Sequence, residues 1–124
     1  MISRPISDSG PGRLRPFCGD DIPAVVALRP QAFRFSERPS AHALAAYFER
    51  VFCRNPWVDP ELPSWVYEDE RERVAGFLGV IPRRMLFQGE PIRVAVATQL
   101  MVAPASRGLA GRRLSGHFWP VLRI

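Results

Sequence analysis

The residues best suited to chemistry lie close together near the carboxyl end of the sequence, in the stretch MVAPASRGLAGRRL over residues 101–114. An apolar run ends at Pro104, and Arg107 and two glycines follow before apolar spacing resumes. This pattern predicts a strand, a tight turn and a helix. The first N–H groups of a helix are unpaired and its dipole is positive there. The turn is therefore suited to binding a phosphate or a similar anion.

Individual residues of the turn have separate parts in anion binding. Gly108 and Gly111 let the backbone approach a ligand closely, and Arg107 can donate two parallel hydrogen bonds to a phosphate. Arg112 and Arg113 fall in the first helical turn, where their charge opposes the dipole and a bound anion would relieve that cost. Two familiar phosphate loops are excluded, because the chain has no GxGxxG and, lacking lysine, no GxxxxGK[ST].

Charge is distributed unevenly along the chain, whose net charge is +5. Residues 83–124 carry seven arginines against Glu90 alone, a net of +6, whereas residues 1–82 have a net of −1. The positive potential therefore surrounds the turn and suits an anionic ligand. An alternative is a small non-enzymatic basic module that binds nucleic acid or a protein partner through residues 83–124. Because the positive charge is concentrated at a strand–turn–helix, it favours an anionic ligand bound at the turn over nucleic acid binding.

Two helices are expected in the first half of the chain. Asp20 or Asp21 is expected to cap the first helix, and Pro30 to end it. Ser40 is expected to cap the second, over which apolar residues recur at three- and four-residue steps.

Strands are expected over residues 13–17, 64–69 and 74–81, with Pro82 ending the third. Residues 85–103 are expected to form two further strands joined by a turn near residues 88–91, the longer second one over 92–103. A third helix follows the turn at Arg107. The resulting β–α–α–β–β–β–α order defines an α+β class with a mixed, mostly antiparallel sheet.

This order, the opening LRPF and DDIPAVVALRPQAF, and the stretch LMVAPASRGLAGRRL resemble the N-terminal two-thirds of the GNAT N-acetyltransferase superfamily. The resemblance implies acetyl-coenzyme A as co-substrate and an amine of a small molecule or peptide as acceptor. It places the pantetheine arm along the strand end and the pyrophosphate in the turn. The turn is one residue shorter than the family pattern. The matching cofactor-binding residues are Leu100, Met101, Val102, Arg107, Gly108, Leu109, Ala110, Gly111 and Arg112.

The family pattern continues into a strand–helix–strand segment that this sequence lacks. The expected organisation is a disordered lead-in over residues 1–12, a partial, truncated domain over 13–119 and a tail over 120–124. A sheet shortened in this way would expose an edge through which two chains could pair.

The catalytic residues stay unknown from the sequence. Both tyrosines precede the turn, which leaves the general-acid position without a candidate. No base is assigned among the weak candidates Glu68, Asp69, His42 and His117, and Gln99 could only orient a water.

Other features point to a cytoplasmic protein. Cys18 and Cys53 match no metal-ligand spacing and are expected to be free thiols in a reducing compartment. The first residues lack the apolar core of a secretory signal, and no apolar stretch is long enough for a membrane span.

Overall fold

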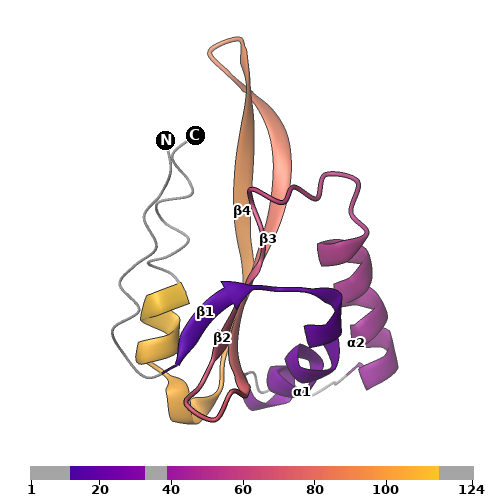
Figure 1. Ribbon diagram of the computed structural model, residues 1–124. Coiled ribbons are helices and arrows are strands. Elements are labelled where there is room, and N and C mark those ends of the chain that lie inside the picture. The colour runs from indigo at the N-terminus through magenta and orange to yellow at the C-terminus, as the bar shows by residue number, and fades with distance from the viewer. Residues whose placement is uncertain (1–11, 33–38, 115–124) are drawn as a thin grey trace.

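The computed structural model describes residues 12–32 and 39–114 of the chain (Figure 1). Its elements follow the predicted β–α–α–β–β–β–α order, which confirms the α+β class. The elements are β1 (Arg13–Pro16), a 3₁₀ turn (Gly19–Asp21), α1 (Ile22–Ala32), α2 (Ala41–Phe48), a π-helical turn (Glu49–Cys53), β2 (Trp65–Glu68), β3 (Val74–Phe87), β4 (Glu90–Val102), a second 3₁₀ turn (Pro104–Ser106) and a helix over residues 109–114.

The four strands form one antiparallel sheet in the order β1-β2-β3-β4. Alternate side chains of a strand point to opposite faces, so the sheet has two cores. Phe77 and Met101 lie in the core under α1 and α2, while Leu78 lies in the core on the other face. Ala110 and Leu114 of the 109–114 helix close this second core. The sheet is therefore the middle layer between two helical layers, as Figure 1 shows.

β3 and β4 form a long hairpin that extends well beyond β2 (Figure 1). Pairing between β2 and β3 reaches only Leu78, and beyond it β3 pairs with β4 alone among the described strands. The expected end of the strand at Pro82 is wrong, because Pro82 pairs with Ala95 inside β3. A proline is tolerated there because no described strand lies on the other side of β3 to pair with an N–H at this position. The turn is two residues, Gln88 and Gly89, both with positive φ.

The ends of the two long helices follow the sequence only in part. Ser40 caps α2 as predicted, since its hydroxyl oxygen accepts a hydrogen bond of 3.0 Å from the N–H of Ala43. Pro30 does not end α1, which continues to Ala32. In the last turn a proline removes one hydrogen bond without stopping the chain from completing that turn. No helix in the described part of the chain is long and apolar enough to cross a membrane.

Candidate functional site

The end of β4 contains a β-bulge that was not predicted from the sequence. Phe77 pairs with Met101 and Gly79 pairs with Thr98, so two residues of β4, Gln99 and Leu100, lie opposite one residue of β3. Gln99 has a φ of 56°, a left-handed conformation that is rare for residues other than glycine. Bulges concentrate next to functional sites because they redirect the backbone and its side chains.

The three residues matched to the pantetheine arm lie from the bulge to the end of β4. Leu100 is exposed, Met101 is buried in the α1–α2 core, and Val102 is half-buried. β4 is the edge strand of the described sheet. Backbone N–H and C=O groups on the outer side of this strand therefore have no strand partner within residues 12–32 and 39–114.

The turn after β4 is compact and leaves donors unused at the start of the following helix. The N–H of Ala103 donates to the carbonyl of Ala75 (2.8 Å), and the chain then makes the 3₁₀ turn. Gly108 has a φ of +90°, which reverses the chain into the 109–114 helix. The first helical hydrogen bond runs from the N–H of Arg112 to the carbonyl of Gly108 (3.0 Å). The N–H groups of residues 109–111 have no backbone acceptor among the described residues.

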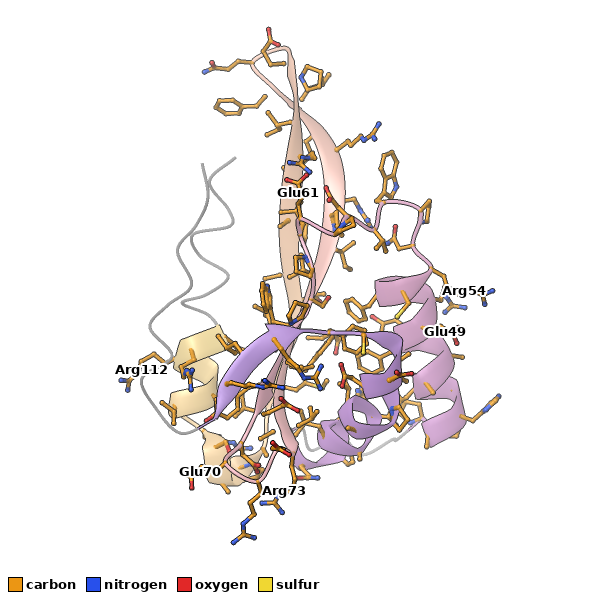
Figure 2. All side chains as sticks on the ribbon, in the orientation of Figure 1. Glu49, Arg54, Glu61, Glu70, Arg73 and Arg112 are labelled. Carbon is orange, nitrogen blue, oxygen red and sulfur yellow. The ribbon has the colours of Figure 1, made fainter. Side chains whose placement is uncertain are left out.

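The helix after the turn is oriented by its buried face. Ala110 and Leu114 are fully buried against the sheet, which leaves Arg112 on the exposed side. Figure 2 shows Arg112 projecting from this helix away from the sheet. Arg107 is also exposed, and neither arginine forms an ion pair within the described part of the chain.

Arg113 has a different role from its neighbour Arg112, although the sequence places both in the first helical turn. Arg113 is buried, donates a hydrogen bond of 3.1 Å to the carbonyl of Gly12, and lies over the ring of Tyr67 at 5.5 Å. It therefore ties the residue that precedes β1 to the helix. Relief of charge by a bound anion therefore stays a prediction for Arg112, which faces solvent, and does not apply to the buried Arg113.

An open pocket of about 380 Å³ lies beside the turn, between the β2–β3 connection and residues 105–109. Asp69 accepts hydrogen bonds from the N–H groups of Arg71 and Arg73 and from the Arg73 side chain. These bonds, from Arg73 above all, lower the pKa of Asp69. Glu68 pairs with Arg13 and Arg15, and mainly the Arg13 hydrogen bond lowers its pKa. Both carboxylates stabilise local structure, and neither is suited to be a general base near neutral pH.

The structure assigns no general-base role to the two histidines. His42 is exposed on the first turn of α2, and His117 lies outside the described residues, as does nearly all of the predicted lead-in and the whole tail. No group of three or more metal-binding side chains occurs among the described residues.

The structure adds a tyrosine that sequence reasoning missed. The side-chain amide of Gln99, at the bulge, lies 3.5 Å from the hydroxyl oxygen of Tyr47 on α2. Tyr47 is half-buried, so its hydroxyl is held against the strand end. The two residues are 52 positions apart, and no sequence pattern links them.

The four-stranded sheet, its bulged edge strand and the turn that follows make up one α+β domain. Residues 13–117 match the family described as the acetyltransferase (GNAT) domain. The chain belongs to this GNAT family, as the resemblance of its sequence predicted. No curated protein sequence matches the chain.

Solved structures with the same fold include an N-myristoyltransferase and N-acetyltransferases. N-myristoyltransferase of Saccharomyces cerevisiae, crystallised with myristoyl-CoA, aligns with a TM-score of 0.70 at 12% identity, over 96% of this chain and 28% of that one. Glucosamine-6-phosphate N-acetyltransferase of Arabidopsis thaliana aligns at 0.62 and 13% identity, over 89% and 73%. A GCN5-related N-acetyltransferase of Kribbella flavida aligns at 0.60 and 19% identity, over 90% and 64%. The chain thus spans under a third of N-myristoyltransferase.

Proposed function

We propose that this chain binds an acyl-coenzyme A, with acetyl as the acyl group, and supports its transfer to an amine. The observation that carries the proposal is the turn after β4. It combines a glycine at φ +90° with three N–H groups and two exposed arginines that have no backbone acceptor and no ion pair, respectively, among the described residues. Membership of the GNAT family and the shared fold support the same use of this turn.

The pyrophosphate is proposed to bind at the start of the 109–114 helix. The N–H groups of Leu109, Ala110 and Gly111 would donate to its oxygens, and the helix dipole would favour its negative charge. Arg107 and Arg112 would add hydrogen bonds assisted by charge. The pantetheine arm would then follow the outer edge of β4 from Val102 back toward Leu100, where backbone groups have no strand partner within the described residues.

The acyl group would in this arrangement reach the bulge at Gln99. In the transfer, the amine nitrogen bonds to the thioester carbonyl carbon, the C–S bond breaks, the amine loses a proton and the thiolate gains one. N–H groups at the strand end can stabilise the oxyanion that forms on the carbonyl. We propose Tyr47 as the proton donor to the thiolate, because its hydroxyl is held beside Gln99.

Binding of the donor should depend on the exposed arginines of the turn. Replacing Arg107 with Gln should weaken acetyl-coenzyme A binding at least tenfold, because one charge-assisted phosphate contact is worth about 1.5–3 kcal/mol. Arg112→Gln should act in the same direction, and isothermal titration calorimetry measures both.

A matched control for this titration is Arg54→Gln, which removes an exposed arginine at the end of the π-helical turn. Figure 2 places Arg54 on the opposite side of the sheet from Arg112. This variant should bind acetyl-coenzyme A as the wild type does. Equal affinity of all three variants would contradict the assignment of the turn, and displacement of the donor by short duplex DNA would favour the nucleic-acid alternative.

Tyr47→Phe should separate turnover from donor binding. Loss of a general acid lowers the rate by about 100-fold, whereas the aromatic ring and its packing are preserved. Release of free thiol from acetyl-coenzyme A, followed over a panel of primary amines, should therefore show a lower kcat and an unchanged donor KM. A fall in donor affinity with unchanged kcat would assign Tyr47 to binding alone.

A further inference from the structure

The loop over residues 54–63 is held against the outer part of the β3–β4 hairpin, on which it has no strand pairing (Figure 1). Arg93 of β4 donates to the carboxylates of Asp59 (2.5 Å) and Glu61 (3.4 Å), which fixes the loop to the hairpin. Within the loop, the side chain of Asn55 accepts from the N–H of Trp57 (2.9 Å), and Asp59 accepts from the N–H of Glu61 (2.9 Å). The loop is therefore organised before any ligand arrives.

A pocket of about 230 Å³ lies between this loop and the hairpin. One wall is apolar and is formed by Pro56, Trp57, Val58 and Pro82. The rest of the lining includes arginine side chains from the hairpin, among them Arg84. We call this site the Trp57–Arg84 pocket. Its volume is below the range of roughly 300–1,000 Å³ that is usual for sites of drug-sized ligands, which limits its occupant to a small molecule.

Trp57 and Arg84 form the recognition element of the pocket. The guanidinium carbon of Arg84 lies 5.2 Å from the centre of the Trp57 ring, although the Trp57 residue is 44% exposed. A guanidinium stacked on a ring keeps its N–H groups in its own plane, where they can donate as a pair to a carboxylate. The apolar atoms of the loop lie next to these donors.

The charges of the pocket leave an excess of free donors. Arg93 is neutralised by Asp59 and Glu61. Arg83 and Arg84, in contrast, have no carboxylate partner within the described part of the chain. The Arg83 side chain donates one hydrogen bond, to the carbonyl of Pro82. An uncompensated guanidinium pair beside an apolar wall suits a ligand that has an anionic end and an apolar body.

We propose that the Trp57–Arg84 pocket binds a small aromatic carboxylate. Its ring packs against Trp57 and the prolines, and its carboxylate accepts two hydrogen bonds from Arg84, with Arg83 adding positive charge. This site is separate from the one proposed for the acyl donor. Arg93, which lines the pocket, and Gln99, where the acyl group is proposed to lie, are six residues apart on β4, which corresponds to about 20 Å.

Benzoate is the probe for the proposal, and acetate and benzyl alcohol represent its two halves. Calorimetric titration of the full chain should show benzoate binding at least tenfold tighter than either half. Arg84→Gln and Trp57→Leu should each weaken benzoate binding at least tenfold. Arg54→Gln should leave it unchanged, because that residue lies outside the pocket. Circular dichroism and thermal unfolding of each variant establish that it is folded.

Two further measurements make the outcome decisive. Arg84→Lys keeps the charge but loses the planar pair of donors, so benzoate binding should fall to a value between those of wild type and Arg84→Gln. Saturation with acetyl-coenzyme A should leave the benzoate affinity unchanged, which keeps this test independent of the donor site. Benzoate binding no tighter than that of acetate, or equal in wild type and Arg84→Gln, would overturn the proposal.

Discussion

Phe77→Ala is expected to destabilise the protein by about 3–5 kcal/mol, the usual cost of truncating a buried phenylalanine. Phe77 is fully buried in the core under α1 and α2. Its ring meets those of Phe17, Phe48 and Phe52 edge to face, with centroids 5.2, 5.6 and 5.3 Å away. Rigid rings on three sides cannot collapse into the space left by the mutation, which favours the upper part of the range.

Chemical denaturation in urea, with the midpoint and slope compared between variants, measures this loss. Phe87→Ala is the matched control, because it removes the same side chain at the end of the hairpin, where Phe87 is 61% exposed. The control should change the free energy of unfolding by less than about 0.5 kcal/mol. Equal costs for the two variants would show that the α1–α2 core is not packed as described.

Asp21→Asn is expected to cost about 3 kcal/mol, the lower end of the cost of breaking a buried ion pair. The Asp21 carboxylate accepts hydrogen bonds of 2.6 and 2.8 Å from Arg15 and one of 2.9 Å from the N–H of Cys18. In the variant the side chain of Arg15 keeps its ion pair with Glu68 (3.3 Å), and it is 27% exposed to solvent. Its charge therefore stays partly compensated, which favours the lower end of the range.

The lowered pKa of Asp21 predicts how the stabilisation from this ion pair depends on pH. The hydrogen bonds from Arg15, followed in effect by that from Cys18, lower the pKa of Asp21 below its ordinary value. The stabilisation is complete above the pKa of an unfolded aspartate, about 3.9. It is lost only as the pH falls through the lower pKa of the folded state. The difference between wild type and Asp21→Asn should stay constant from about pH 5 to 8 and shrink in stronger acid.

Urea titrations of both proteins at a series of pH values test this dependence. Arg13 provides a control, since its side chain is 64% exposed and its ion pair with Glu68 should contribute little. Arg13→Gln should therefore change stability by less than about 1 kcal/mol. A difference between wild type and Asp21→Asn that shrinks already near neutral pH would contradict the assigned pKa direction.

Much of the fold could be predicted from local patterns. The cap at Ser40 and the apolar spacing after it specify α2, because a helix start needs an acceptor for its free N–H groups. The strand, proline, glycine and arginine around residues 101–112 predicted the turn, and the structure confirms the order of elements around it. These features depend on neighbouring residues, whose chemistry is visible in the sequence.

The two incorrect predictions, that Pro82 ends a strand and that Pro30 ends a helix, show that local sequence rules are not sufficient at prolines. Pro82 continues β3 because pairing with β2 ends at Leu78, and a sequence does not tell how far two strands pair. Pro30 lies inside α1 because it falls in the last turn, where only two residues of the helix follow it. In both cases the surroundings decide whether the missing N–H matters.

By itself, the sequence determined the family, the order of the elements and an arginine-rich turn suited to phosphate. Tertiary structure alone decided the bulge at Gln99, its approach to Tyr47 and the different roles of Arg112 and Arg113. It also brought Trp57 of a loop to Arg84 of the hairpin. The physical reason is the same in each case. Register, burial and contacts between distant residues depend on how the layers pack, and neighbouring residues along the chain do not encode them.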